Sequence, residues 1–547
     1  MKNKVTIYVF LMLLLLTYFN PQFAHANEES KMQDEVIYMI MVDRFNNGDP
    51  SNDHEINLND PFAYHGGDFK GIIDKLDYLE EMGFTAIWLT PIFENTEKGY
   101  HGYWVNDFYN TNEHFGTIDE FRSLVKEAHK RDIKVILDFV VNHVGPNHEW
   151  LNDPSKKSWL HENKPISNWN DPIEVENGWL YDLPDLNQDN PEVKKYLIDA
   201  ARWWIAETDI DGFRLDTVKH VPKDFWIDFS TAVKSEKNSF FLIGEVWHDN
   251  PNIVAGYQNT GIDGFMDFSQ NDSLRTAFEK TDQSLGWLFS NNDRNHLMFD
   301  RPEMLGQFID THDIPRFAHL AINNDQDRFT QMKQALSYIY TAPGIPIVYY
   351  GTEIAMDGGN DPDNRRMMNF GADDNLIDYV SKLGSLRQDL TPLTRGDMEL
   401  LFEEEGMAVF KRTYQDDTVV IAINNTSVDQ RVVLDDSFEK EKELIGMLGG
   451  RVVEPDGTEY VIELESGQSE IFRLVDQERG IWFYVGISII ILLGVFLYVW
   501  VRRRGKSLKW MERTYASHST DCSSHALKSS ERKEYHILWK ENGGKKQ

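Results

Sequence analysis

Carboxylate and imidazole groups recur in this chain at the ends of short apolar runs, where a β-strand would end. Five segments show the pattern: 100–104, 138–143, 212–216, 244–248 and 308–313. Three of them carry an acid that could break a glycosidic bond, namely Asp216, Glu245 and Asp313. A single acid of this kind is more often a helix cap or half of a salt bridge. Five such segments in one chain predict chemistry at a glycosidic bond.

The local sequence gives two of these acids different surroundings. Arg214 precedes Asp216 by two residues, and residues i and i+2 face the same side of a strand. We therefore expect the guanidinium to hold the Asp216 carboxylate ionised and aimed. Glu245 follows the apolar run 240–244, where burial would raise its pKa and keep it protonated. An ionised nucleophile beside a protonated acid is the arrangement of retaining glycosidases.

Eight short β-rich runs alternate with helical patterns and would position these acids. The runs are 36–42, 86–89, 134–137, 212–215, 240–243, 264–266, 306–309 and 345–349. Amphipathic segments such as 118–131 and 193–207 lie between them. Alternating strands and helices imply a parallel sheet, and eight repeats predict an α/β fold closed into a (β/α)8 TIM barrel. Barrels of this kind place their active sites at the C-terminal ends of the strands, where the acids fall.

Two parts of the chain depart from this alternation. The interval 144–183 is rich in Asn, Pro and Trp, which predicts a small inserted domain after the third strand of a barrel spanning 27–390. From residue 391 the apolar runs become short and alternating. They predict a C-terminal antiparallel β-sandwich domain over 391–476.

The first 26 residues have the pattern of a secretory signal. Lys2 and Lys4 precede an apolar stretch, and the small residues Ala24 and Ala26 follow it. This order predicts a signal peptide over 1–26 that is cleaved after Ala26, with an uncleaved anchor as the alternative.

A second apolar segment, 481–501, carries no charge and has aromatic residues at both borders. As a helix it is long enough to cross a bilayer, and three arginines follow it directly at 502–504. A buried globular helix would not need that basic border, so we expect one transmembrane helix, with the basic tail 502–547 in the cytoplasm. The expected location is the cell membrane, with a single pass and the catalytic part outside, as on a bacterial cell surface.

The formal net charge of −34 argues against nucleic acid or an anionic lipid surface as the partner of the external part. Such a surface suits bound cations and a neutral substrate. The chain has one cysteine, Cys522, which lies in the expected tail. The external part would therefore be stabilised without disulfides.

Over residues 34–475 the sequence resembles the α-amylase family of glycoside hydrolases, above all its calcium-dependent α-amylases and cyclodextrin glucanotransferases. The resemblance implies that Asp216 is the nucleophile, that Glu245 is the acid and then the base, and that Asp313 binds sugar hydroxyls and favours the transition state. It further implies a set of residues that bind substrate around the cleavage site. These are His101, Tyr103, Trp104, His143, Arg214, Lys219, His220, His312, Asp361 and Arg365.

The resemblance also implies calcium (Ca2+) at two structural sites. The first would use the side chains of Asn142 and Asp185 with the main-chain carbonyl of His220, and would hold the inserted segment to the barrel. The second would use a cluster of hard oxygen ligands near the N-terminus. Its members are Asn47, Asp49, Asn52, Asp53, Gly66 and Asp68. The alternative for the second cluster is a turn rich in Asn and Asp.

The resemblance favours endo-hydrolysis of α-1,4-glucosidic bonds in starch-derived maltodextrins. The pair Lys219-His220 and the segment 183–186 are typical of members that act on these bonds. Tyr181 stands where glucanotransferases carry the aromatic residue around which a glucan chain curls, so transglycosylation is the alternative. The pair Val246-Trp247 differs from the usual glucanotransferase residues. A non-catalytic carbohydrate-binding ectodomain or transporter partner is a further alternative, although such proteins typically lack one of the three acids.

Overall fold

The computed structural model describes residues 31–372, 375–435, 438, 442–476, 489 and 491–500. The expected signal peptide and the basic tail lie outside these residues, and so do residues 481–488, 490 and 501 of the expected transmembrane segment. Within the residues that are described, no helix is both long enough and apolar enough to span a bilayer. The chain divides after Asp476 into two compact units, and the first contains every strand among the described residues.

Eight parallel strands form the centre of the first unit, as the sequence predicts. They are β1 (Ile37–Ile40), β2 (Ala86–Leu89), β5 (Lys134–Phe139), β6 (Gly212–Leu215), β7 (Phe241–Gly244), β8 (Gly264–Phe265), β9 (Gly306–Gln307) and β10 (Ile345–Tyr349). Their order in the sheet is β8-β7-β6-β5-β2-β1-β10-β9. An isolated parallel bridge between Met266 and Gly306 joins the two ends of this order and brings the sheet close to a ring. The arrangement is that of a (β/α)8 barrel.

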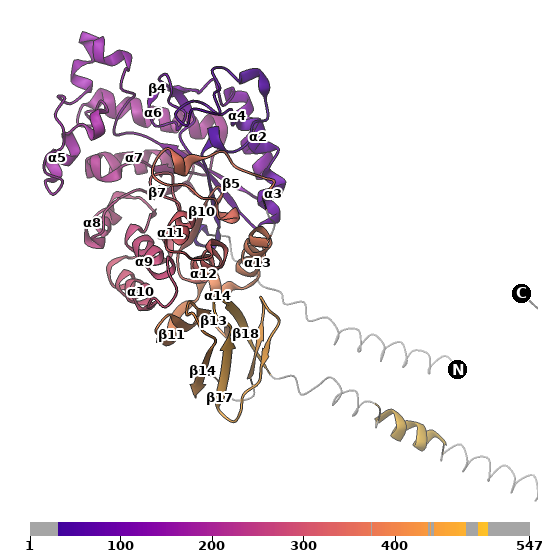
Figure 1. The fold of residues 1–547 in the computed structure, drawn as a ribbon. Helices are drawn as coiled ribbons and strands as arrows, with labels where there is room; N and C mark the ends of the chain where they lie inside the picture. Colours follow the sequence, from indigo (N-terminus) through magenta and orange to yellow (C-terminus); the bar gives the residue numbers. More distant parts are fainter. Residues whose placement is uncertain are drawn as a thin grey trace, which may run out of the picture. The chain divides into compact units, whose positions relative to one another are not determined.

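Helices follow the strands and cover the outside of the barrel (Figure 1). In chain order they are α2 (Phe69–Ile73), α3 (Leu76–Glu81), α4 (Ile118–His129), α6 (Pro191–Thr208), α7 (Lys223–Glu236), α8 (Pro251–Ala255), α9 (Phe268–Phe278), α10 (Gly286–Met298), α11 (Phe317–Asn323), α12 (Arg328–Thr341), α13 (Asn375–Asp389) and α14 (Thr391–Arg395). The start of α4 shows how the sequence sets these bounds. Thr117 and Glu120 form a reciprocal capping box that satisfies two free main-chain N–H groups. The helix then turns Phe121, Leu124 and Ala128 into the core.

Two excursions interrupt the barrel after its second and third strands. The first is a short antiparallel pair, β3 (Phe93–Asn95) and β4 (Val105–Thr111), which the sequence patterns do not predict. The second falls in the interval read as an inserted domain and has little regular structure, with α5 (Pro172–Asn177) as its one α-helix. Isolated β-bridges connect the two ends of this excursion and tie it to the chain that follows it, including His143 with Asp185 and Leu160 with Leu186.

A C-terminal antiparallel domain follows the barrel. Its main sheet has the order β11-β12-β13-β18-β15-β16, and β14 pairs with β17 separately. The strands are β11 (Asp397–Glu404), β12 (Met407–Tyr414), β13 (Asp417–Asn424), β14 (Gln430–Asp435), β15 (Lys442–Gly446), β16 (Val452–Val453), β17 (Glu459–Leu464) and β18 (Ser469–Asp476). Val409 and Val420 from the main sheet share one buried cluster with Val432 and Ile462 from the pair, so the two sheets enclose a common core.

This domain packs against the barrel near α12 and α14 (Figure 1), and buried arginines contribute to the junction. The guanidinium of Arg412, on β12, donates to the carbonyl of Thr341 at the end of α12 and to that of Gly396 at 2.8 Å. Arg387, on α13, donates to the carbonyls of Gly344 at 2.7 Å and Leu393 at 3.0 Å. Main-chain carbonyls that would otherwise be buried without partners are satisfied by these two side chains.

Candidate active site

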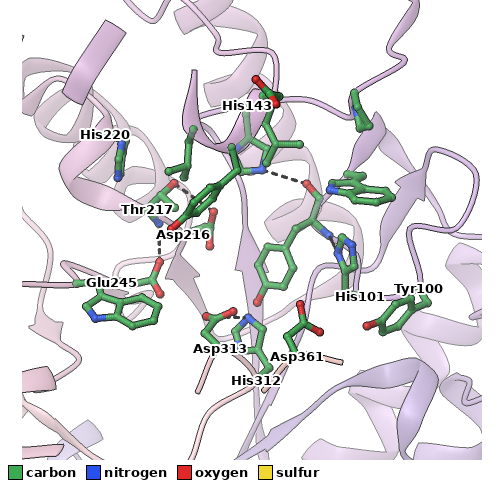
Figure 2. A pocket seen from close by; sticks show the side chains of 18 of the residues that line it. Tyr100, His101, His143, Asp216, Thr217, His220, Glu245, His312, Asp313 and Asp361 are labelled. Carbon is green, nitrogen blue, oxygen red and sulfur yellow. Dashed lines mark hydrogen bonds and ion pairs between the residues drawn. The ribbon is translucent and has the colours of Figure 1, made fainter. Parts of the chain in front are cut away.

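One pocket of about 920 Å³ opens among the loops that follow the C-terminal ends of the barrel strands (Figure 2). Most of the residues that the sequence predicts for catalysis and substrate binding line it. They are His101, Tyr103, Trp104, His143, Asp216, Lys219, His220, Glu245, His312, Asp313, Asp361 and Arg365. Arg214 is the exception, because it lies buried on β6 with 1% of its surface exposed. The second predicted calcium cluster does not contribute to the pocket lining.

Arg214 is the centre of the ionic contacts below the pocket. Its Nη1 atom lies 2.7 Å from Asp216 Oδ1 and 3.0 Å from each carboxylate oxygen of Asp138. Its Nη2 atom lies 2.6 Å from Glu245 Oε1. The predicted contact between Arg214 and Asp216 is confirmed, and the same guanidinium also binds two further carboxyl groups.

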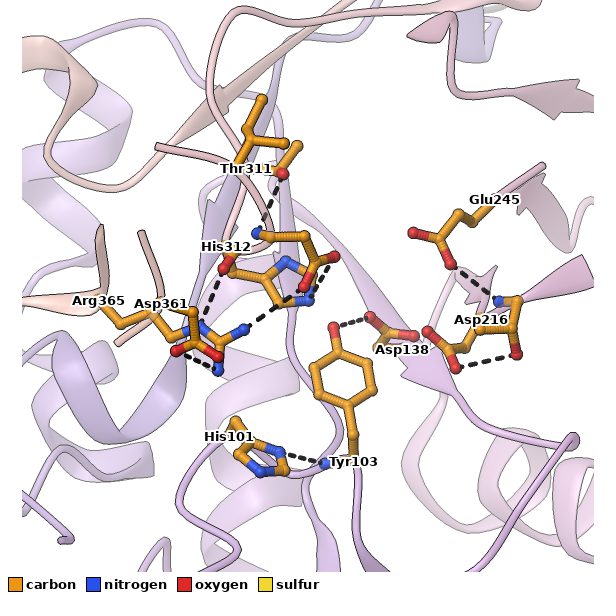
Figure 3. A network of polar contacts seen from close by, with 12 residues as sticks. His101, Tyr103, Asp138, Asp216, Glu245, Thr311, His312, Asp361 and Arg365 are labelled. Atoms are coloured by element: carbon orange, nitrogen blue, oxygen red, sulfur yellow. Dashed lines mark hydrogen bonds and ion pairs between the residues drawn. The ribbon is translucent and has the colours of Figure 1, made fainter. Parts of the chain in front are cut away.

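Asp138 was not predicted as a site residue. It lies on β5 directly opposite Arg214 in the register of β5 and β6. The Tyr103 hydroxyl donates to its Oδ2 atom at 2.8 Å, and the Trp88 indole donates to the same atom at 3.3 Å (Figure 3). Burial raises the pKa of Asp138 to about 7. An acid between Leu137 and Phe139 in an otherwise apolar strand is the sequence signal that could have identified it.

Glu245 has the raised pKa that its apolar sequence context predicts. Burial is the largest cause and raises the pKa to about 8, with further increases from the nearby charges of Asp216 and Asp313. The guanidinium of Arg214 and the main-chain N–H of Thr217, which donates to Glu245 Oε2 at 2.9 Å, act in the opposite direction. At neutral pH the carboxyl group can therefore act as a proton donor.

Asp313 belongs to a second ionic group on the other side of the pocket (Figure 3). Arg365 Nη2 lies 3.4 Å from Asp313 Oδ1, and Arg365 Nη1 lies 3.1 Å from Asp361 Oδ1. The ring nitrogen Nε2 of His312 lies 3.3 Å from Asp313 Oδ2. Arg365 thus links the strand-end acid Asp313 to Asp361, which comes from the loop after β10.

Aromatic rings form the wall between these two ionic groups. The ring of Tyr103 is parallel to that of His312, with an interplanar angle of 3° and 5.0 Å between centroids. His101 Nδ1 accepts the main-chain N–H of Tyr103 at 3.1 Å, and the edge of His101 contacts Trp104. Burial and nearby cationic groups lower the pKa of both His101 and His312. Both imidazoles are therefore neutral at neutral pH and can share hydrogen bonds with a polar ligand.

The opposite wall is built from the inserted segment and the loops after β6 and β7. Lys219 Nζ donates to the Trp247 carbonyl at 2.8 Å, and His220 Nδ1 contacts the Val175 carbonyl at 3.1 Å. Tyr181 projects from the inserted segment with 84% of its surface exposed. This wall therefore presents aromatic and cationic side chains to the pocket.

The first predicted calcium cluster brings three oxygen atoms close together. The side-chain oxygen of Asn142 faces only acceptors. Its amide would donate to Asp185 Oδ1 (3.1 Å) and to the His220 carbonyl (2.9 Å) only if its oxygen and nitrogen were exchanged. Three oxygens that converge in this way fit a hard cation. Among the described residues, no group of three His, Cys, Asp or Glu side chains could hold a metal, so such a cation would depend on amide and main-chain oxygens.

The second cluster fits a cation less well. Asp68 accepts main-chain N–H groups of Gly71 at 2.6 Å and Asp49 at 2.8 Å, which caps helix α2. Asp49 in turn accepts the N–H of Ser51 at 3.0 Å. Asn52 Oδ1 is buried without a hydrogen-bond partner. The contacts of Asp68 and Asp49 are those of a capped turn, whereas the unpartnered Asn52 oxygen would suit a cation, so the second calcium site stays a prediction.

Two family models match this chain. The one described as "Alpha amylase, catalytic domain" matches residues 39–382, and the one described as "Alpha-amylase C-terminal domain" matches residues 396–472. The chain therefore belongs to the alpha-amylase family. With its barrel and three strand-end acids, it is an α-amylase-type glycoside hydrolase.

Individual relatives agree with this assignment. The chain is 60% identical to a crystallised Anoxybacillus alpha-amylase, with a TM-score of 0.82, over 83% of this chain and 100% of that one. It is 40% identical to a beta/alpha-amylase of Paenibacillus polymyxa over 71% of this chain, and it spans only 33% of that longer protein. It is 31% identical to a cyclomaltodextrin glucanotransferase of Klebsiella oxytoca, over 71% of this chain and 70% of the relative.

Replacing Arg214 with methionine should destabilise the protein more at pH 8 than at pH 5. Without the guanidinium, the pKa values of the buried carboxyl groups of Asp138 and Glu245 rise further above their values in the unfolded chain. Stability held by protonated acids is lost as the pH rises toward those folded-state values. We expect a loss of about 3–5 kcal/mol at pH 8, the usual cost of breaking a buried ion pair, and a smaller loss at pH 5.

Chemical unfolding at both pH values measures the difference. Arg122→Met is the matched control, because Arg122 forms its ion pairs with Asp119 and Glu207 at the surface. Equal losses for Arg214→Met at the two pH values would contradict the assignment of Arg214 as the cation shared by these acids.

Proposed function

We propose that the protein is a retaining hydrolase that cleaves α-1,4-glucosidic bonds within maltodextrins derived from starch. The observation that carries the proposal is the shared contact of Arg214 with Asp216 and Glu245 at the base of one pocket. These two carboxyl groups reach a common guanidinium from adjacent strands, and burial raises the pKa of Glu245 to about 8. That combination supports a nucleophile and a proton donor acting on one bond.

The reaction proceeds in two steps, formation of a glycosyl-enzyme ester and its hydrolysis. Asp216 attacks the anomeric carbon, the glycosidic bond breaks, and the leaving oxygen takes the proton of Glu245. In the second step water attacks the anomeric carbon and gives its proton to Glu245, while the bonding electrons return to Asp216. Asp313 holds sugar hydroxyl groups and favours the oxocarbenium-like transition state, and Tyr103 packs against the sugar ring.

Cleavage inside a chain is supported by the walls of the pocket. Asp361 and Arg365 line one side, and Lys219 and Trp247 line the other, so glucose units can be bound on both sides of the reacting bond. Trp247 is 42% exposed and lies parallel to Phe268, which leaves one face of its indole free for a sugar ring.

Transglycosylation is the second candidate, and Tyr181 is the observation that favours it. This residue lines the pocket, is 84% exposed and has a left-handed backbone with φ of 49°. A glucan chain curled around that ring could return to the active site as an acceptor. The 60% identical Anoxybacillus alpha-amylase supports hydrolysis as the main reaction.

Incubation of the protein with maltoheptaose tests the proposal. We expect shorter linear maltodextrins as the main products, separated by chromatography and identified by mass. Asp216→Asn, which keeps the shape of the side chain but removes the nucleophile, should reduce turnover by at least about 10⁴-fold. Cyclic products or chains longer than seven units would instead assign the protein to the transglycosylases, and absence of turnover would leave only a binding role.

We also propose that Ca2+ binds at Asn142, Asp185 and the His220 carbonyl. A divalent cation there would neutralise the charge of Asp185 and connect the inserted segment to the loop that follows the nucleophile. This role is structural, and no step of the reaction passes through the ion. The convergence of three oxygens on this point supports the assignment.

Removal of calcium should lower the thermal stability of the protein. At a calcium concentration about 100 times the Kd, binding contributes about 2.7 kcal/mol, which chelation with EGTA would remove. Asn142→Ala should abolish the stabilisation by added calcium, whereas Asn170→Ala, in an exposed part of the inserted segment, should keep it. A calcium response that survives in Asn142→Ala would place the ion elsewhere.

We further propose that residues 1–26 export the protein and that residues 481–501 anchor it in the cell membrane. The charge pattern of these two segments supports this location. Deletion of 481–547 should move the enzyme from the membrane fraction to the medium, as detected by an antibody against the catalytic part. Equal membrane retention of the full-length and truncated chains would contradict the anchor.

A further inference from the structure

Thr217 has a strained backbone and forms a hydrogen bond with each of the two main acids of the site, Asp216 and Glu245. It follows Asp216 directly, and its backbone is left-handed, with φ of 45° and ψ of 44°. A β-branched side chain seldom adopts this conformation, so the surrounding structure must impose it. The turn is fixed by two main-chain hydrogen bonds, from Val218 N–H to the Glu245 carbonyl and from His220 N–H to the Thr217 carbonyl, both 2.9 Å.

This conformation gives Thr217 a contact with each acid. Its main-chain N–H donates to Glu245 Oε2 at 2.9 Å, and its hydroxyl donates to Asp216 Oδ2 at 3.1 Å. Figure 2 shows Thr217 beside Asp216, with a dashed line that joins it to Glu245. The hydroxyl is therefore placed to respond to any change of charge on the nucleophile.

The two oxygens of Asp216 are held differently. Oδ1 lies 2.7 Å from the charged Arg214, whereas Oδ2 accepts from the neutral hydroxyl of Thr217. Hydrogen bonds from an ionised donor are the stronger kind, so Oδ1 is the more firmly held atom. Oδ2 is the oxygen that can leave its partner and form the bond to the anomeric carbon.

We propose that Thr217 is a positioning residue that assists the departure of Asp216 from the glycosyl-enzyme, an inference that rests on the proposed retaining mechanism. When Oδ2 bonds to the anomeric carbon, its negative charge disappears and the Thr217 hydroxyl loses a good acceptor. When water attacks the anomeric carbon and transfers its proton to Glu245, the bonding electrons return to Oδ2. The hydroxyl then donates to the returning charge, so it lowers the barrier of the second step more than that of the first.

Kinetics with α-maltosyl fluoride test this role, because fluoride departs readily and the second step limits kcat. Thr217→Val removes the hydroxyl and keeps the branched shape. The loss of a hydrogen bond to a charged group should lower kcat about tenfold. The ester then accumulates, so KM should fall by a similar factor and kcat/KM should stay nearly constant. Mass spectrometry after rapid acid quench should detect a maltosyl unit on Asp216 in the variant during turnover.

Conservative and remote variants separate positioning from a structural effect. Thr217→Ser keeps a hydroxyl and should recover most of the lost kcat. Thr231→Val, the same change on the outside of α7, should leave both constants unchanged. If Thr217→Val lost its far-ultraviolet circular dichroism signal, Thr217→Ala would replace it, with the same division between kcat and KM expected.

The outcomes distinguish this inference from the proposed function. A wild-type enzyme that forms no ester on Asp216 would overturn both. Two other results would overturn the role of Thr217 alone, provided that the wild-type enzyme forms the ester. One is an equal kcat in Thr217→Val and wild type. The other is a fall in kcat/KM of the variant at constant KM.

Discussion

A single buried guanidinium holds the candidate active site together. Arg214 has almost no contact with solvent, and three carboxyl groups surround it within hydrogen-bond distance. Burying so many ionisable groups is costly unless each is paired, because a charge removed from water loses its hydration. One cation cannot neutralise three anions, and the burial that raises the pKa values of Asp138 and Glu245 reduces this imbalance. The raised pKa values of Asp138 and Glu245 therefore fit a site in which one guanidinium serves three carboxyl groups.

The barrel supplies the geometry that this contact requires. Neighbouring parallel strands place Asp138 opposite Arg214 and Arg214 opposite Ile243, two residues before Glu245. A shift of one residue in this register would turn the guanidinium to the other face of the sheet. The aromatic wall is linked to the same point, since Tyr103 donates to Asp138 and its ring is parallel to that of His312. Substrate contacts and catalytic acids thus share one rigid frame.

Much of the fold and of the candidate site can be predicted from the sequence. The eight barrel strands were placed correctly because apolar β-rich runs separated by amphipathic helices have few alternative folds. Asp216, Glu245 and Asp313 were singled out because each follows such a run, and all three line the pocket. The antiparallel pair β3 and β4 was missed, because its polar and apolar residues mix and a bulged register hides the alternation. Asp138 was given no role because its partners Arg214 and Tyr103 are distant in the sequence, although an acid inside an apolar run is itself unusual.

The sequence by itself determined which acids end the barrel strands and that Arg214 and Asp216 share a face, because these relations depend only on residues close together in the chain. It also determined the direction of the Glu245 pKa shift, since an apolar strand precedes that residue. Only the tertiary structure decided that Asp138, Asp216 and Glu245 share one guanidinium and that Asp313 is held by Arg365 instead. Those contacts join residues on different strands and loops, and their geometry depends on strand register and barrel closure, which no local pattern contains. The same holds for Thr217, because its contact with Glu245 exists only where the ends of β6 and β7 meet.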